Sequence, residues 1–430
     1  MKRGAGRVAS SPARPDDRRG FLKKMTGATA LLMSARGLAL AELPAEEGPT
    51  GEPLRIGLVG CGPWGREILG TLARAPWARV AAVCDTYPAF LKRGQELAPG
   101  ARATADHREL VGLPDVEAVV VATPSHRHRD LALEALAASK HVYCEAPLAT
   151  TLEDARAIAQ AASSAKTVFQ GGLQGRSNPL YKHVSRFVRS GVLGTEAQVT
   201  ARWSRKDSWR RAAPTPEREA EINWRLRSAT SAGLPGEVGI HQLDVASLYL
   251  GALPEAVTGF GSTLAWRDGR DVPDDVHCVL DYPKGVRLAW SATLASSAGG
   301  AFTLFQGSNS SVMLRETRGW LIKEADSPLL GWEVYARKES VLDESGIALI
   351  ADATKILAAG QKPGEVGSPE AEKPPLLAAF EDFFRAIREG APSVCGPLEA
   401  YQATAIALAA QRATLAGARV AIPRDTLSLS

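Results

Sequence analysis

The sequence predicts an α/β protein in two parts: a doubly wound parallel sheet, then an α+β domain with a large, mainly antiparallel open sheet. Two observations predict this architecture. Up to about residue 172, short apolar runs alternate with amphipathic helical stretches, as in β-α-β units. From about residue 195 the apolar segments lengthen and alternate with polar residues, which is typical of an antiparallel sheet with one covered face.

Length and composition agree with a two-domain globular protein. The chain has 430 residues, 45% hydrophobic and 23% charged. Its formal net charge is +4, but nine of the 51 basic residues lie in residues 1–41. Without that segment the chain has 42 basic and 45 acidic side chains. We therefore expect neither nucleic acid nor an anionic membrane as a partner.

Residues 1–41 have the features of an export signal. Arg18 and Arg19 precede a short apolar stretch, and Ala39-Leu40-Ala41 resembles a cleavage site. The pattern resembles a twin-arginine signal, which predicts that the twin-arginine translocation machinery exports the folded protein to the periplasm. The stretch is short and Arg36 interrupts it, so we expect no membrane anchor. The alternative is a disordered basic tail.

The remaining boundaries follow from composition. We expect a linker at 42–52, a nucleotide-binding domain at 53–172, a substrate and oligomerisation domain at 173–422 and a tail at 423–430. Two helical stretches, 374–390 and 397–417, close the second domain, and Gly417 suits a helix C-cap.

Cysteine and histidine spacing gives no sign of a metal site. The five cysteines show no CxxC spacing, and three of them end predicted strands, so we interpret them as buried apolar side chains. The histidines lack partners at metal-ligand spacing, and no metal is expected.

A glycine-rich turn follows the first apolar run. In LRIGLVGCGPWGRE, Gly60 allows a tight turn, Gly62 lets the backbone approach a pyrophosphate, and Gly65 lets the helix pack on the strand. The helix N-terminus would face the phosphates. Asp85 ends the second strand, where a carboxylate would bind ribose hydroxyls and repel a 2′-phosphate. The pattern predicts a Rossmann domain that binds NAD, NADP being less favoured, with Pro63 and Trp64 of the turn among the contacts. The alternative is a glycine turn in an unrelated α/β domain.

Four further segments resemble the Gfo/Idh/MocA family, over roughly residues 53–422. They are VVVATPSHRHRDLALEAL, VYCEAPLATTLEDA, GGLQGRSNPLYK and LPGEVGIHQLDVASLYLG. The resemblance implies that Thr123 and Pro124 line the nicotinamide side and that His128 is the family histidine of the cofactor site. It also implies that Glu145 contacts the nicotinamide ribose or the substrate; the alternative is that Glu145 caps the strand end.

The chain departs from the family at two positions. Ala146 stands where the hydride-transferring members have the acid/base Lys of Glu-Lys-Pro, and alanine cannot move a proton. Glu237 replaces an Asp. His241 is then the best remaining acid/base, with Glu237 one helical turn before it on the same face. The alternative for His241 is simple packing. Sugar contacts are expected from Arg176, Tyr181, Trp224, Arg225 and Asp244, of which Asp244 is equally well explained as structural.

The resemblance implies an NAD(P)-dependent oxidoreductase that acts on a carbohydrate or polyol, as a homo-oligomer formed through an exposed sheet face. Export would separate the enzyme from free NAD, so we expect a tightly bound cofactor that is recycled in place. One alternative is a redox-neutral glycosidase that works by oxidation, elimination, hydration and reduction. Another is a non-catalytic, NAD-loaded sugar-binding protein.

Overall fold

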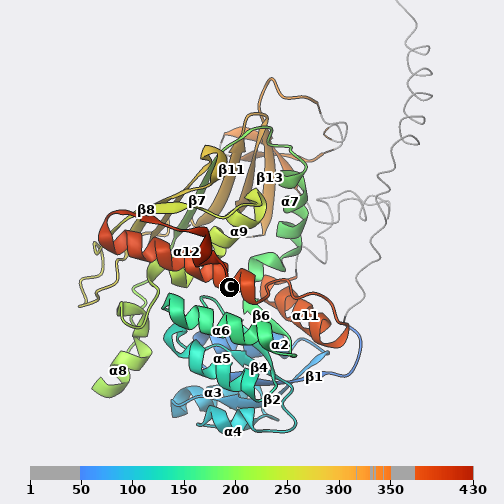
Figure 1. Cartoon of the computed structure of the whole chain (residues 1–430), viewed down its shortest axis with the longest axis vertical. Helices are drawn as coiled ribbons and strands as arrows, with labels where there is room; N and C mark the ends of the chain where they lie inside the picture. Colours follow the sequence, from blue (N-terminus) through green and yellow to red (C-terminus); the bar gives the residue numbers. More distant parts are fainter. Residues whose placement is uncertain are drawn as a thin grey trace, which may run out of the picture. The chain divides into compact units, whose positions relative to one another are not determined.

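The computed structural model describes residues 49–315, 317–329, 333, 336–341, 343–349 and 373–429 (Figure 1). The predicted signal peptide, residues 1–41, and most of the predicted linker lie outside this range. Within it, no helix combines the length and the apolar character needed to span a bilayer.

The first domain is a six-stranded parallel sheet in the order β3-β2-β1-β4-β5-β6, which confirms the doubly wound prediction. Its central strands are buried on both faces, as expected for continuous apolar runs. The strands are β1 (Leu54–Val59), β2 (Ala78–Cys84), β3 (Arg102–Thr104), β4 (Ala118–Val121), β5 (His141–Glu145) and β6 (Phe169–Gly172).

Five helices connect these strands, and their first residues explain where they begin. Asp106 accepts a hydrogen bond from the Arg108 amide, and Thr151 accepts one from the Asp154 amide, so both act as N-caps. The helices are α2 (Pro63–Leu72), α3 (Pro88–Leu97), α4 (His107–Val111), α5 (His128–Ala137) and α6 (Leu152–Ser164).

The second domain contains a ten-stranded sheet in the order β14-β15-β13-β12-β11-β7-β10-β9-β8-β16. Only the β7–β10 pair is parallel among these described strands, which confirms the mainly antiparallel prediction. The strands are β7 (Glu196–Ser204), β8 (Ala256–Ser262), β9 (Asp275–Asp281), β10 (Arg287–Thr293), β11 (Ala301–Gly307), β12 (Ser310–Arg315), β13 (Arg318–Lys323), β14 (Lys338–Val341), β15 (Glu344–Leu349) and β16 (Arg419–Ala421).

Helices α9 and α12 lie beneath this sheet, on the side of the first domain (Figure 1). Helix α12 is buried along most of its length and ends at Gly417, whose φ of 60° is the left-handed C-cap predicted from the sequence. The helices after β6 are α7 (Pro179–Arg189), α8 (Pro216–Ile222), α9 (Ile240–Leu250), α11 (Pro375–Arg388) and α12 (Pro397–Ala416).

Helix α11 packs on the first sheet, which corrects its predicted place in the second domain. Phe380 and Phe383 are buried against Tyr143 of β5, with ring centroids 4.6 and 5.7 Å from the tyrosine ring. The same cluster holds Leu54, Ile56 and Leu58 of β1 together with α2. This face of the parallel sheet therefore needs a helix from the far end of the chain to exclude water.

Residues 423–429 of the predicted tail are hydrogen-bonded to helices α6 and α12. Residues Arg424–Leu427 form a 3₁₀ turn, and Leu427 is buried. Arg156 of α6 donates to the Ser428 carbonyl at 2.7 Å, and the Tyr401 hydroxyl of α12 donates to the Thr426 carbonyl at 2.7 Å. The segment therefore links α6 to α12, because side chains of both helices donate hydrogen bonds to its main-chain oxygens.

Strand β8 ends at Ser262, because the residues that follow bond a buried carboxylate. The carboxylate of Asp274, fully buried, accepts hydrogen bonds from the amides of Leu264, Ala265 and Trp266 at 2.7 to 3.0 Å. Three amides pointing at one carboxylate are incompatible with a ladder to β9, so the chain leaves the sheet.

The outer face of β8 and β9 exposes large apolar side chains. Phe260 is 61% exposed and Val279 is 42% exposed. The homo-oligomer expected from the resemblance stays a prediction.

All five cysteines are buried and free, which confirms their interpretation as apolar core residues.

Candidate active site

Four neighbouring strands of the first sheet deliver predicted site residues to one edge. Gly60 follows β1, Asp85 follows β2, Thr123 lies just beyond β4, and Glu145 ends β5. The strand order reverses between β1 and β4, and ligands of open α/β sheets bind at such a switch point. The structure therefore brings the predicted cofactor residues together.

The glycine turn leaves room for a phosphate. Gly60 has a φ of 104°, and a Cβ there would lie 2.5 Å from the Ala122 oxygen. A Cβ on Gly65 would lie 1.8 Å from the Gly60 oxygen, so the tight turn requires both glycines. At Gly62 a Cβ would meet only Phe90, at 3.9 Å. Gly62 also N-caps α2 without a side-chain cap, so helix amides remain for an anion.

Two residues of this turn begin α2. Pro63 occupies the first helical position, where its missing N–H costs nothing. Trp64 is 42% exposed, an unusual state for a large aromatic side chain in a turn at a binding edge.

Asp85 is oriented by the backbone. Its carboxylate accepts from the amides of Cys61 and Tyr87, both at 2.8 Å. Burial raises the pKa of Asp85, while these two amides and the charge of Arg218 act in the opposite direction. A fixed, half-buried carboxylate at this position fits the ribose hydroxyls of NAD.

The loop after β4 holds an unsatisfied hydroxyl. The Thr123 Oγ1 is buried and has no hydrogen-bond partner in the described part of the chain. Pro124 follows it and leads into the turn Ser125–Arg127. A buried orphan oxygen at the edge where a nicotinamide ring would lie is accounted for by a bound ligand.

His128 positions this loop and does not line the site, which corrects the predicted cofactor contact. Its ring is buried, with Nε2 2.9 Å from the Thr123 oxygen and Nδ1 2.9 Å from the Pro147 oxygen. Both ring nitrogens therefore face main-chain carbonyls, and the neutral imidazole, whose pKa burial lowers to about 4, donates to one of them. The imidazole joins the loop after β4 to the loop after β5.

Glu145 holds a proton near neutral pH. Its side chain is 7% exposed, and Gln174 donates to its carboxylate at 3.1 and 3.3 Å. Burial raises the pKa of Glu145 to about 7, although hydrogen bonds from Trp64 and Gln174 oppose the shift. Gln174 follows β6 in a 3₁₀ turn; it lies in the segment GGLQGRSNPLYK that resembles the family, but it was not among the predicted site residues. Ala146 comes next and offers no titratable group.

His241 begins α9 with its imidazole uncommitted. The ring is half-buried and has no hydrogen-bond partner among the described residues. Burial lowers the pKa of His241 to about 4, so the imidazole is neutral at pH 7. The imidazole is thus uncharged and has no hydrogen-bond partner among the described residues, and its acid/base role stays a prediction.

Glu237 bonds Ser125, Ala232 and Arg225, and no bond to His241 occurs among the described residues. It lies in a π-helical turn, Pro235–Gly239, and its side chain is 2% exposed. It accepts from the Ser125 hydroxyl at 3.2 Å and from the Ala232 amide at 3.1 Å. These bonds join the loop after β4 to the start of α9, and the catalytic role expected of Glu237 stays a prediction.

Arg176 and Asp244 form a buried ion pair with each other. The guanidinium meets the carboxylate at 2.7 Å through Nη2 and at 2.9 Å through Nε. Asp244 is 4% exposed. This bidentate contact joins the loop after β6 to α9 and fits the structural alternative for Asp244. The sugar contacts expected of both residues stay predictions.

Trp224 and Arg225 lie together beside Glu237. The Arg225 guanidinium is 4.5 Å from the Trp224 ring centroid, and its Nε is 3.5 Å from the Glu237 carboxylate. Trp224 is 8% exposed, whereas the Arg225 side chain is 44% exposed. Arg225 can therefore reach a ligand, and Trp224 forms its support.

Tyr181 lies elsewhere, in the first turn of α7. It is half-buried, and its carbonyl accepts from the Tyr249 hydroxyl at 2.6 Å. It packs near Gly175, on the side of the Arg176–Asp244 pair. No group of three or more potential metal ligands occurs in the described ranges.

The two domains match known families. Residues 54–173 match the oxidoreductase family with an NAD-binding Rossmann fold, and residues 181–313 match the GFO/IDH/MocA C-terminal domain. Fold and site thus define an oxidoreductase with an NAD-binding Rossmann domain. The two matches together span more than half of the chain, and the protein belongs to the Gfo/Idh/MocA family.

Relatives in this family differ in chemistry. Inositol 2-dehydrogenase 2 of Saccharopolyspora erythraea is 33% identical over 51% of this chain and 60% of its own length. The 2,7-anhydro-N-acetylneuraminate hydratase of Escherichia coli is 25% identical over 56% of this chain and 62% of its own. The chain thus spans about three-fifths of these two relatives.

A solved structure shares the fold. Levoglucosan dehydrogenase in complex with NADH and L-sorbose superposes with a TM-score of 0.70 at 21% identity, over 87% of this chain and all of the other.

The buried carboxyl of Glu145 predicts a pH-dependent stability. Its pKa is raised from 4.5 to about 7, so its contribution is complete below pH 4.5 and is lost as the pH rises through 7. The loss amounts to at most about 3 kcal/mol. We expect Glu145→Gln to flatten the fall in unfolding free energy between pH 4.5 and 7 and to be more stable than wild type at pH 8, measured by urea denaturation. Glu67→Gln, at an exposed position of α2, is the control. Parallel curves for wild type and Glu145→Gln would contradict the assignment.

Proposed function

We propose that this protein is an NAD-dependent oxidoreductase that acts on a carbohydrate or polyol and keeps its cofactor bound through the catalytic cycle. One observation carries the proposal. The Ser125–Glu237 hydrogen bond joins the loop on the nicotinamide side of the first domain to the start of α9, where the uncommitted imidazole of His241 lies. This bond supports our proposal that the dinucleotide edge and His241 belong to one site.

The chemistry follows from the two titratable groups. Bound NAD would accept the hydride from a carbinol carbon. His241 accepts the hydroxyl proton, because its imidazole is neutral at pH 7. Glu145, with a pKa near 7, can hold a proton in the same edge of the site. These residues take over the role that Ala146 cannot fill. The exposed Arg225 guanidinium is suited to hydrogen-bond sugar hydroxyls.

The relatives support the substrate class. One is a dehydrogenase of inositol, a polyol, and another is a hydratase of an anhydro sugar acid.

Export supports the recycling of the cofactor. Arg18 and Arg19 stand before a short apolar stretch in a basic N-terminal segment. A protein moved to the periplasm would have no cytoplasmic NAD pool to exchange with, so each reduction of the cofactor must be reversed in the same site. The reduced cofactor would return its hydride either to a second sugar or to the oxidised form of the first sugar.

The hydratase relative favours a second candidate, a redox-neutral glycosidase. Oxidation of a ring hydroxyl to a ketone would acidify the neighbouring C–H. His241 would remove that proton as the glycosidic oxygen leaves with the bonding electron pair. Water would then add to the resulting double bond, and return of the hydride to the ketone would restore the oxidised cofactor.

Absorbance of bound NADH near 340 nm tests the proposal on the purified protein. We expect an added substrate sugar to reduce bound NAD, and a second carbonyl sugar to reverse the reduction. Transient reduction of the cofactor with release of a free sugar from a glycoside would instead identify the glycosidase. No spectral change with any carbohydrate would contradict both and leave a non-catalytic, NAD-loaded sugar-binding protein.

His241→Ala tests the acid/base. We expect turnover to fall by about 10²- to 10⁴-fold, the usual contribution of a positioned acid/base, while NAD stays bound. His277→Ala, on the exposed face of β9, is the matched control and should turn over normally. Unchanged turnover in His241→Ala would place the proton transfer elsewhere, with Glu145 first in line.

The export proposal can be tested by cell fractionation. Replacing both Arg18 and Arg19 with lysine is expected to retain the protein in the cytoplasm, because twin-arginine recognition needs the guanidinium pair. Replacing Arg7 and Arg14 with lysine controls for the general basic charge. A periplasmic location for the first double variant, or a cytoplasmic one for wild type, would refute export by this route.

A further inference from the structure

A segment of the second domain leaves both sheets and reaches the first domain. Residues 207–223 follow β7 and contain α8, which Figure 1 draws well away from the ten-stranded sheet, at the level of the first domain. Arg218 of α8 donates through Nη2 to the Thr86 carbonyl at 3.3 Å. Its guanidinium also lies 5.4 Å from the Tyr87 ring centroid. We call residues 207–223 the arm.

The arm ends beside the adenosine side of the dinucleotide site. Thr86 and Tyr87 directly follow Asp85, and the Tyr87 amide holds the Asp85 carboxylate. The Tyr87 ring packs edge-on against Phe90, with centroids 4.8 Å apart. The Phe90 ring lies next to Gly62, 3.9 Å from where a Cβ on that glycine would be. The Arg218 guanidinium therefore lies at the rim of the place where the adenosine ribose and its phosphate would bind.

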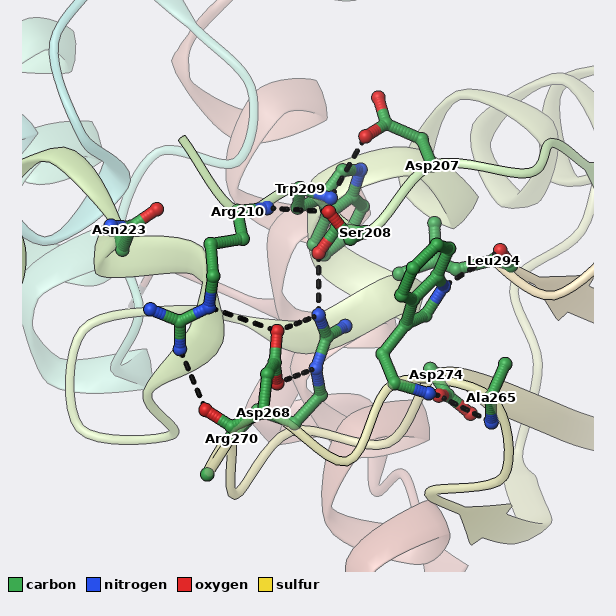
Figure 2. A network of polar contacts seen from close by, with 12 residues as sticks. Asp207, Ser208, Trp209, Arg210, Asn223, Ala265, Asp268, Arg270, Asp274 and Leu294 are labelled. Atoms are coloured by element: carbon green, nitrogen blue, oxygen red, sulfur yellow. Dashed lines mark hydrogen bonds and ion pairs between the residues drawn. The ribbon is translucent and has the colours of Figure 1, made fainter. Parts of the chain in front are cut away.

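A polar network fastens the arm to the second domain (Figure 2). Arg210 donates to Glu219 of α8 at 2.6 Å and to the Asp268 carboxylate at 3.0 Å. Arg270, whose side chain is 1% exposed, donates to Asp268 at 2.8 Å and to the Ser208 carbonyl. These two guanidiniums hold the pKa of Asp268 far below its usual range. Asp268 is thus the common acceptor that fixes the start of the arm.

The two ends of the arm are also tied to each other. The Asn223 side chain accepts from the Arg211 amide at 2.7 Å and donates to the Arg211 carbonyl at 3.0 Å. Two reciprocal bonds between a side chain and one residue's backbone close the base of the loop. Helix α8 itself is capped by Thr215. The arm is therefore a built element with a defined position.

We propose that the arm is a clasp for the cofactor, in which Arg218 binds the adenosine ribose and its adjoining phosphate and slows NAD release. The clasp rests on the proposed NAD site. A guanidinium has several donors in a planar fork, which suit ribose and phosphate oxygens. Arg218 is 29% exposed and already held by Glu221 and Tyr87, so little side-chain entropy is lost on binding. Because α8 belongs to the second domain, the cofactor would bridge the two domains, and its release would require the arm to move.

Dissociation of NADH from the full-length protein tests the clasp, followed by the change in cofactor fluorescence when the complex is mixed with excess NAD. We expect Arg218→Ala and Arg218→Gln each to raise the dissociation rate by roughly tenfold, the loss of one charge-assisted hydrogen bond. Arg210→Ala should act in the same direction by releasing the arm from Asp268. Arg267→Ala removes an exposed arginine of the neighbouring loop and should leave the rate unchanged.

The outcomes separate the two proposals. If wild type binds no NADH, the proposed function fails. If wild type binds NADH and both Arg218 variants, folded by their thermal unfolding, release it at the wild-type rate, the clasp is overturned while the proposed function stands.

Discussion

The geometry of the site depends on the buried contact between Arg176 and Asp244. Arg176 follows the last strand of the parallel sheet, and Asp244 lies one turn along α9 from His241. A carboxylate that is 4% exposed would be costly without a partner, so the bidentate guanidinium fixes α9 against the edge of the first sheet. The Ser125–Glu237 bond adds a second point of attachment, on the other side of the histidine. With two contacts across the junction, His241 has a defined place relative to the strand ends.

Two proton-carrying groups of this site are shifted in opposite directions by the same cause. Burial disfavours charge, and it therefore keeps Glu145 protonated to about pH 7 and His241 neutral down to about pH 4. At neutral pH the site can both hold and accept a proton without a buried ammonium. The proposed acid/base roles of these two side chains rest on this arrangement, since Ala146 has no titratable group.

Local patterns predicted the parts of the protein that depend on nearest neighbours. The parallel strands, the glycine turn and Asp85 could be read from the sequence because backbone geometry and strand ends determine them. The partners of Arg176 and Glu237 could not, since Asp244 and Ser125 lie far away in the chain. Thr123 is only five residues from His128, but a polar side chain can serve either a ligand or a carbonyl. The predicted domain of helix α11 was wrong for a related reason. Its amphipathic pattern shows that one face is buried but does not show which sheet buries it. Gln174 lies in a segment that resembles the family, but that segment does not show that its amide would bond Glu145; the arm carries no recognisable motif.

The position of α11 has a consequence for the order of events during synthesis. The apolar face of β1 is one of the first parts of the fold to be made, yet its covering phenylalanines come near residue 380. Until those residues have been synthesised, one apolar face of the parallel sheet stays exposed to water. Residues 424–429, which link α6 to α12, are synthesised later still. The apolar face of β1 thus stays uncovered until nearly the whole chain has been made. For the twin-arginine export that we propose, the protein would have to complete this late docking before it is translocated.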